Sequence, residues 1–320
     1  MKDGVLSQIG IQAEESFAGS GLGLIHNVTG LREFEPDWSS NFRSTKVSVW
    51  RTESAKADFG DMFEGRMDLE LSSDYLLLLL FGNLMTMKSQ TEAEGYTSTI
   101  FRAHYSAPVW QPSLRFYATF DNGPWQIYGG VVLKSARLTI RAGTLAHLSL
   151  DWTAREMTEF LENPGWSINA PPASPLVGSS GAIQFDDTAM DDAIELSFSV
   201  AVPRGMNRMD RSGLSARATG QGPTVISGNL VQYFETTRNL PSLVRNLTAF
   251  KIAASVLSVG GYGVVVTLPR CSPSSGQATP TGQQDVMAAI PFRALTDSAQ
   301  VEESEIEVEI RTAGGSSTSS

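Results

Sequence analysis

Short stretches that alternate or concentrate β-branched and aromatic residues recur along the whole chain, separated by turn signals. These stretches cover residues 46–50, 114–120, 136–140, 193–200, 263–268, 286–293 and 305–310. A period of two between apolar positions is typical of antiparallel strands with one buried face. We therefore expect a mainly β protein.

Only two segments have a helical pattern. The Leu-rich residues 75–82 follow possible N-cap side chains at 72–74, and residues 240–247 follow possible N-caps at 236–239. The first predicted helix closes at Gly82, a residue type that often ends helices. Each segment predicts one short, buried helix.

The two predicted helices have matching surroundings. Gly65 and Gly228, 163 positions apart, each begin a strand that leads into the helix, and Met67 falls in step with Leu230. This spacing predicts a duplicated domain of two strands, a short helix and several further strands. Chance similarity between two strand-helix units is the alternative.

The prolines between residues 162 and 175 predict the joint between the two copies, because proline interrupts strand pairing. We place a first domain at residues 1–170, a second at 171–312 and a flexible C-terminal tail at 313–320. The chain length of 320 residues also suggests two domains.

Composition narrows the possible partners. Hydrophobic residues make up 41% of the chain, and the net charge is -10, which disfavours a surface that clamps nucleic-acid phosphates. The single cysteine, Cys271, rules out an intrachain disulfide and is expected to be an unreactive thiol. We see no signal-peptide core and no apolar run of the ~20 residues that span a bilayer, so synthesis in a reducing cytoplasm without membrane insertion is expected.

Catalytic patterns are missing from the sequence. The three histidines lack metal-site spacing, and neither a nucleophile elbow nor a phosphate loop occurs. The acidic residues at 186–187 and 191–192 lack the spacing of a calcium-binding loop. We therefore expect no enzyme activity, cofactor or metal.

Two further polar features, a pair of hydrophilic stretches and a row of glutamates, are candidates for contact with other molecules or with solvent. Hydrophilic stretches at residues 51–61 and 203–213 occupy matching places in the two copies, and loops of this length are either disordered or functional. Near the C-terminus Glu305, Glu307 and Glu309 alternate with apolar residues, which predicts three carboxylates on one strand face, bathed by solvent or by a channel.

The N-terminal run at residues 9–20, with Gly10 and Glu14, resembles the first motif of long phage tail tube proteins. A sheet-forming stretch at 31–38, the Gly65 strand with its Leu-rich helix, and the glycine-containing strands at 128–140 follow in the order of that family. The resemblance extends from about residue 8 to residue 312.

The resemblance implies two tandem tail-tube-type β-sandwich or β-barrel domains, each with a short flanking helix. Single-domain relatives form hexameric rings, so a duplicated subunit implies a homotrimer with pseudo-sixfold symmetry. Rings would stack into a hollow tube in the virion tail, around a tape measure protein and between a tail terminator and distal tail or baseplate proteins. Genomic DNA would pass through without tight binding.

The same resemblance assigns ring stacking to the two hydrophilic stretches. The candidate residues are Arg51, Glu53, Lys56, Asp58, Asp61, Arg204, Arg208, Asp210 and Arg211. It also makes Glu305, Glu307 and Glu309 candidates for the channel wall. The Ser/Pro/Gly-rich stretch at residues 272–284 departs from the family pattern and is interpreted as an insertion that decorates the tube exterior.

A different class of function is also compatible with a strand-rich chain. A soluble β-sandwich binding module, for example for carbohydrate, could use Trp110, Trp125 or Trp152 as a stacking platform. Tryptophans in such chains more often fill cores, so their exposure discriminates between the two functions.

Overall fold

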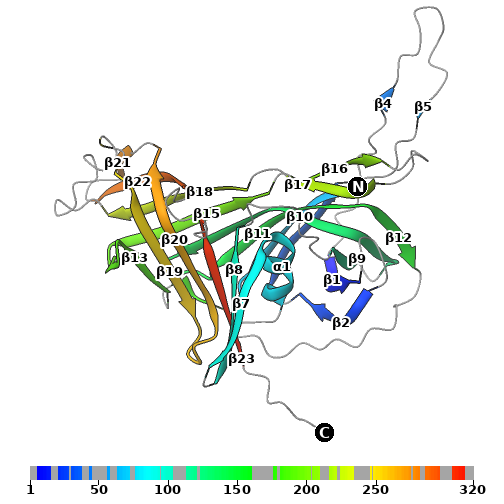
Figure 1. Cartoon of the computed structure of the whole chain (residues 1–320), viewed down its shortest axis with the longest axis horizontal. Helices are drawn as coiled ribbons and strands as arrows, with labels where there is room; N and C mark the ends of the chain where they lie inside the picture. Colours follow the sequence, from blue (N-terminus) through cyan, green and yellow to red (C-terminus); the bar gives the residue numbers. More distant parts are fainter. Residues whose placement is uncertain are drawn as a thin grey trace, which may run out of the picture.

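The protein was analysed as a computed structural model. It describes residues 6–15, 21–28, 30–37, 43–44, 56–57, 63–72, 76–93, 95–103, 113–120, 123–160, 176–178, 181–202, 204–209, 216–221, 224–233, 246, 248–274, 277–281, 285–295 and 305–313. Within these residues the chain is mainly antiparallel β, as the sequence predicts (Figure 1).

The elements of the first half run from β1 to β12. They are β1 (Leu6–Glu14), β2 (Gly21–Asn27), β3 (Leu31–Asp37), β4 (Arg43–Ser44), β5 (Lys56–Ala57), β6 (Phe63–Glu70), α1 (Leu76–Leu84), β7 (Thr86–Ala93), β8 (Tyr96–Arg102), β9 (Leu114–Phe120), β10 (Trp125–Arg141), β11 (His147–Ala154) and β12 (Glu156–Phe160).

The elements of the second half run from β13 to β23. They are β13 (Gly181–Phe185), β14 (Thr188–Ala189), β15 (Ala193–Ala201), β16 (Arg204–Met209), β17 (Ala216–Gln221), β18 (Val225–Tyr233), β19 (Phe250–Leu257), β20 (Gly263–Pro273), β21 (Gln277–Thr281), β22 (Asp285–Ala294) and β23 (Glu307–Ala313).

Most of the predicted strands that fall on described residues are confirmed. β9, β15 and β22 match the predicted ranges closely, and β10 and β20 extend beyond them. The predicted strand at 46–50, the second predicted helix apart from residue 246, and the joint near residue 170 lie outside the described residues. No helix in the described part of the chain is long and apolar enough to cross a membrane.

One long sheet runs through both halves of the chain. Its strand order is β3-β6-β11-β10-β15-β18-β22-β21, with every neighbouring pair antiparallel. The end of β20 continues the line of β21, because Cys271 and Pro273 also pair with β22. The contact between β10 and β15 is therefore the place where the two halves join.

Two further sets of strands lie against the long sheet. In the first half the order is β2-β1-β9-β10-β12, and in the second it is β14-β13-β19-β20-β23-β8-β7. Long strands link the layers, since β10 and β20 each begin in the second layer and end in the long sheet.

Aromatic side chains fill the space between the layers of the first half. The ring of Phe34 from the long sheet stacks on Trp152 at 5.5 Å and meets Phe116 of the second layer at 6.4 Å. Tyr128 contacts Trp152 at 5.2 Å between ring centroids. Burial of such large apolar surfaces between two sheets is typical of a β-sandwich.

The helix α1 covers one end of this core and is longer than predicted. Gly82 lies inside the helix, which ends at Leu84, so the prediction that Gly82 closes it is wrong. Buried Asn83 accepts a hydrogen bond from the Leu133 amide at 2.8 Å, and the Met85 amide still donates to the Phe81 carbonyl at 2.7 Å. These tertiary contacts hold the last turn in place of a glycine cap.

The long sheet contains the same strand register twice. Pro36 lies opposite Gly65 in β3–β6, and Phe198 lies opposite Gly228 in β15–β18. The long sheet thus consists of two sets of four strands, β3-β6-β11-β10 and β15-β18-β22-β21. Equivalent residues are 162 positions apart in the first strand of each set and 163 in the second. The second spacing is the one that the sequence predicts from the two glycines.

The third and fourth strands repeat with a different spacing. In the first set Trp152 pairs with Gly65 and with Leu133. In the second set Phe292 pairs with Gly228 and with Pro273. Equivalent residues are thus 140 positions apart in both strands. The shorter spacing shows that the first half holds extra residues between its second and third strands, where α1, β7 and β8 occur.

Irregularities of the ladders also recur at matching places. The register of β3 shifts between Leu31 and Glu33, and that of β15 shifts between Ala193 and Glu195, which are 162 positions further on. The Glu70 amide donates to the Gly30 carbonyl at 2.7 Å, as the Tyr233 amide donates to the Asp192 carbonyl at 3.1 Å. β-Bulges are specific features of a strand pair, so their recurrence is unusual for unrelated strands.

Two polar stretches differ from the sequence interpretation. The long hydrophilic stretches are not loops throughout, because β4 pairs with β5 and β16 pairs with β17. The stretch at 272–284 is not a simple insertion, since β21 pairs with β22 in the same register as β10 with β11. Backbone pairing with a neighbouring strand thus overrides a mixed-charge composition in the hydrophilic stretches and a composition rich in Ser, Gly and Pro at 272–284.

Candidate functional site

The long sheet has one polar face, and its first half is charged. Glu64 and Arg66 on β6 and Asp151 on β11 alternate with buried core residues. Lys134 Nζ lies 2.5 Å from Glu64 Oε1, and Arg66 Nε lies 3.2 Å from Asp68 Oδ1. Oppositely charged neighbours therefore balance some of the carboxylates on this part of the face.

The same face carries fewer charges in the second half. Ser199 and buried Ser197 on β15 and Ser227 and Asn229 on β18 occupy the matching positions, and the charged residues are Glu195 on β15 and Arg293 on β22. Both halves thus present polar side chains, but only the first presents a dense array of ions.

At the outer edge of this face two carboxylates are adjacent. Glu33 and Glu35 lie on the same side of β3 and are exposed. The repulsion from Glu35 raises the pKa of the Glu33 carboxyl above its ordinary value. Free charges at a strand edge oppose pairing with unrelated chains.

The predicted channel-wall carboxylates have cationic partners in the second layer. Glu307 Oε1 accepts hydrogen bonds from Arg102 at 2.6 Å and Lys88 at 3.2 Å, and Glu309 accepts from Ser98 at 2.7 Å and Arg311 at 2.8 Å. These contacts fix β23 to β8 of the first half.

The pKa values of both carboxyls follow from these partners. Burial alone would raise them, but hydrogen bonds and charges from the basic side chains outweigh burial, so the pKa values of Glu307 and Glu309 are lowered. β23 begins at Glu307, two residues later than predicted, and Glu305 lies in a bend before it. The predicted alternation is confirmed, since Ile306, Val308 and Ile310 are buried and the three glutamates are partly exposed.

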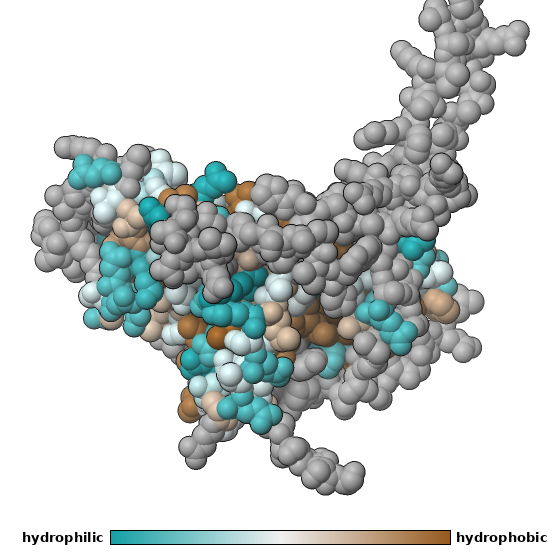
Figure 2. Space-filling view, viewed as in Figure 1, coloured by the Kyte–Doolittle hydropathy of each residue, from teal (hydrophilic) through white to brown (hydrophobic). Residues whose placement is uncertain are grey.

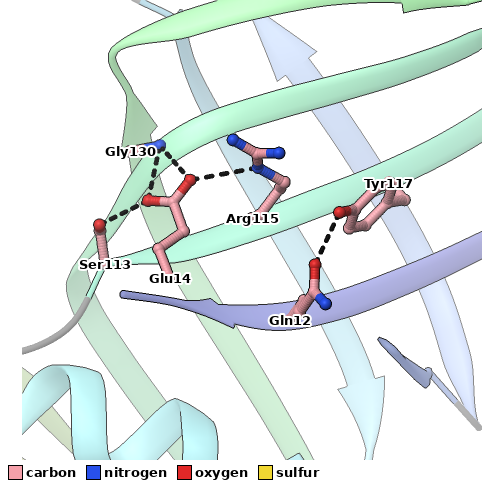
Figure 3. A network of polar contacts seen from close by, with 6 residues as sticks. All are labelled: Gln12, Glu14, Ser113, Arg115, Tyr117 and Gly130. Atoms are coloured by element: carbon pink, nitrogen blue, oxygen red, sulfur yellow. Dashed lines mark hydrogen bonds and ion pairs between the residues drawn. The ribbon is translucent and has the colours of Figure 1, made fainter. Parts of the chain in front are cut away.

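A buried carboxylate lies where β10 passes between layers (Figure 3). Glu14 accepts a hydrogen bond from the Ser113 hydroxyl at 2.5 Å and from the Gly130 amide at 3.1 Å, and Arg115 Nε lies 3.3 Å from it. Burial raises the pKa of the Glu14 carboxyl, and these hydrogen bonds partly oppose that rise.

The position of Gly130 explains this arrangement. The register of β10 with β9 shifts between Tyr128 and Val131, and Gly130 has a φ of 63°, which favours glycine. Its amide leaves the ladder and donates to both oxygens of Glu14. Sequence reasoning found Glu14 only as part of a motif, since nothing in the sequence pairs it with a bulge 116 residues away.

Few of the predicted ring-stacking residues can be placed. Lys56 lies in β5, and Arg204 and Arg208 lie in β16. Arg51, Glu53, Asp58, Asp61, Asp210 and Arg211 lie outside the described residues. The β4–β5 hairpin follows β3 and precedes β6, as β16–β17 follows β15 and precedes β18, so the two hairpins occupy equivalent places in the order of the strands. β4–β5 projects from the body of the molecule, whereas β16–β17 lies along its upper side in Figure 1.

The acidic turn at residues 186–187 has a structural explanation. Asp186 and Asp187 have φ values of 47° and 61° and form the tight turn between β13 and β14. Asp186 Oδ1 accepts the Lys251 amide at 2.8 Å, and Asp187 Oδ1 lies 2.6 Å from Lys251 Nζ. The described residues contain no cluster of three or more metal-ligating side chains.

Three side chains relevant to other functions are buried. Cys271 is inaccessible, and burial raises the pKa of its thiol to about 12, which fits an unreactive thiol. Trp152 is fully buried and Trp125 is 8% exposed, so neither offers a stacking platform, and Trp110 lies outside the described residues. The carbohydrate-binding alternative therefore loses both of its describable tryptophans.

Hydrophilic side chains also cover the β7–β8 hairpin, which lies at the lower edge of the molecule in Figure 2. The described surface is therefore made mainly of polar strand faces and polar hairpins.

Comparison with known proteins supplies the family. Residues 54–294 match the family model described as phage tail tube protein, which is more than half of the chain. No curated protein matches the chain.

Proposed function

Because the chain belongs to the phage tail tube protein family, and is thus a structural subunit of a viral tail, we propose that three copies form a ring with pseudo-sixfold symmetry. The rings stack into a hollow tube through which genomic DNA leaves the virion. The chain has a structural and not a catalytic role.

One observation carries this proposal, namely the repeated register of the long sheet. Each half supplies four strands in the same order, with equivalent bulges and with a polar hairpin between the first two strands. Two equivalent units in one chain make three chains equivalent to six units, which suits closed rotational symmetry.

The polar hairpins support the stacking of rings. β4–β5 and β16–β17 occupy equivalent places in the strand order of the two halves, so six such hairpins around a ring would meet the next ring at regular intervals. Lys56, Arg204 and Arg208 belong to these hairpins, and the other predicted stacking residues flank them in sequence.

The channel wall is better assigned to the polar face of the long sheet than to Glu305, Glu307 and Glu309. The long sheet runs through both halves of the chain, and its end strands β3 and β21 have one neighbour each among the described strands, so it can continue into neighbouring copies. By contrast, β23 is enclosed between β20 and β8. A wall whose carboxylates are only partly paired with basic side chains, and which also carries hydroxyl groups, would let DNA slide without tight binding.

Electron microscopy of the purified protein in negative stain tests the assembly. We expect rings or hollow tubes with threefold or pseudo-sixfold symmetry. A protein that stays monomeric at high concentration and in the presence of the tape measure protein would contradict the proposal.

Particles carrying charge-reversed subunits test the wall. Glu35→Lys with Glu64→Lys should slow DNA release from otherwise normal particles, because added cations bind phosphates. The matched control is Glu307→Lys with Glu309→Lys, which should change subunit stability more than DNA release. The opposite result would place β23 at the channel.

A further inference from the structure

The long sheet ends in two strands that have one neighbour each. In the described residues β3 pairs only with β6, and β21 pairs only with β22. An open edge exposes a row of backbone amides and carbonyls that can pair with another chain. The two edges therefore need a partner or a device that keeps partners away.

The joint between the halves gives a template for that partner. Within one chain, β10 is the fourth strand of the first set and β15 is the first strand of the second set, and they pair from Ser135↔Ala201 to Arg141↔Glu195. β21 is equivalent to β10, and β3 is equivalent to β15. The edge strands are thus the two members of a joint that the chain already makes once.

The spacing of equivalent residues converts this template into a register. Thr139 pairs with Ser197 inside the chain. Thr279 on β21 is the residue 140 positions after Thr139, and Glu35 on β3 is the residue 162 positions before Ser197. The equivalent pair at the sheet edges is therefore Thr279 with Glu35. The same conversion pairs Gln277 with Asp37 and Thr281 with Glu33.

We propose that β21 of one copy pairs antiparallel with β3 of the next copy, with Thr279 opposite Glu35. The partner is a second copy of this chain, and the joint between copies is equivalent to the internal β10–β15 contact of the same sheet. This inference rests on the proposed ring, and it adds the strands and the register that close it.

Prolines at both edges fit this register. Val202 donates to Lys134 at 2.8 Å and Ala142 donates to Ile194 at 2.9 Å at the two ends of the internal joint. Since hydrogen-bonded pairs alternate along an antiparallel ladder, the converted pairs Ala278–Pro36 and Pro280–Phe34 are of the hydrogen-bonded type.

Each of these two pairs contains one proline, so each keeps one of its two hydrogen bonds. Ala278 donates to the Pro36 carbonyl, and Phe34 donates to the Pro280 carbonyl. A proline whose missing amide faces outward leaves its own sheet intact but weakens pairing with unrelated strands. The edges are therefore protected in the free subunit and still compatible with each other.

Disulfide trapping tests the register. Thr279↔Glu35 is a non-hydrogen-bonded pair, whose Cα atoms are ~4.5 Å apart in an antiparallel ladder, within disulfide range. Glu35→Cys with Thr279→Cys should give, on oxidation of assembled protein, covalent dimers and trimers and no larger species. Cys271 should not compete, because its thiol is buried with a pKa of about 12.

Two matched variants define the outcomes. Thr139→Cys with Ser197→Cys places the same pair inside one chain and should give an intrachain disulfide. Glu35→Cys with Thr281→Cys is two residues out of register and should cross-link poorly. If assemblies form and the internal pair oxidises, but Glu35→Cys with Thr279→Cys stays monomeric in denaturing gels, the register is wrong while the ring remains.

A second variant covers failure of the cysteine pair to assemble. Ala278→Pro removes an amide that points away from β22 in this register, so the subunit should fold with an unchanged circular dichroism spectrum but lose ring formation. Wild-type-like rings from Ala278→Pro would overturn the inference. A wild-type protein that never forms rings would instead defeat the proposed function itself.

Discussion

The two halves of the long sheet have the same backbone register, but different side chains fill equivalent positions in them. In the first half Trp152 lies against Gly65, and in the second Phe292 lies against Gly228. The polar face is densely charged in the first half and carries few charges in the second. Strand pairing and bulges, which set the shape of the sheet, are thus more uniform than the chemistry on its faces.

The halves also differ where a long strand crosses between layers. In the first half the crossing is at Gly130, held by the buried carboxylate of Glu14. In the second half β20 crosses near Pro269 and Arg270, followed by buried Cys271. Because one buried carboxylate accepts hydrogen bonds from Ser113 and Gly130 at the first crossing, that crossing is sensitive to a single substitution.

The largest expected effect comes from removing that charge network. Glu14→Ala leaves the Gly130 amide and the Ser113 hydroxyl without their shared acceptor inside the protein. We expect a loss of about 3–5 kcal/mol in the free energy of unfolding, because breaking a buried charge pair leaves its partners unpaired. Urea denaturation followed by tryptophan fluorescence measures it.

Glu14→Gln separates the charge from the hydrogen bonds. The amide keeps one acceptor oxygen for Gly130, so the loss should be much smaller than for alanine. The raised pKa of Glu14 means that its ionised form costs stability at neutral pH, and the wild type should gain stability as the pH falls through that raised pKa. This gain should be missing in Glu14→Gln, and equal losses for both variants would contradict the role of the carboxylate.

The next effect compares the two glycines. A Cβ at Gly65 would lie 2.3 Å from Trp152 Cζ2, and a Cβ at Gly228 would lie 2.4 Å from Phe292 Cζ. Gly65→Ala and Gly228→Ala should each cost about 1–3 kcal/mol by overpacking. Gly65→Ala should cost more, since Trp152 also contacts the rings of Phe34, Phe116 and Tyr128.

Gly82→Ala is the matched control for these variants. Its added Cβ would have one neighbour, Phe101, at 3.7 Å, an ordinary contact, and alanine favours helix more than glycine does. We expect unchanged or slightly raised stability in thermal unfolding. If Gly65→Ala is as stable as Gly82→Ala, the ring of Trp152 can move aside and the close approach is not a constraint.

These comparisons indicate how far the sequence can be interpreted. The spacing between Gly65 and Gly228 predicted equivalent strands, because a glycine below an aromatic ring is required at both places. The bulge at Gly130 and the pairing of β21 were not predictable, since both depend on contacts between residues distant in sequence. The lengths of strands such as β10 were underestimated because turn-like glycines inside a strand mark a bulge and not its end.

A buried amide in the second half gives a smaller effect of opposite sign. Gln232 is inaccessible and forms no hydrogen bond with the described residues, and its equivalent in the first half is Leu69. Gln232→Leu should raise the free energy of unfolding by about 1–2 kcal/mol, because an unpaired buried amide is costly. A lower urea midpoint for Gln232→Leu would mean that the amide has a partner, and Leu69→Gln, which should destabilise, is the reciprocal control.

The smallest effect concerns the contact by which β8 of the first half binds β23 of the second. Glu307→Gln removes the charge that holds Arg102 and Lys88, and since the pair is partly exposed we expect a loss of at most about 1 kcal/mol at neutral pH. The lowered pKa of Glu307 means that its contribution is fully present above the ordinary value of 4.5 and is lost as the pH falls through the lowered pKa. Wild type and Glu307→Gln should therefore differ at pH 7 and converge in acid. A constant difference in melting temperature across this range would show that the glutamate acts through packing and not through its charge.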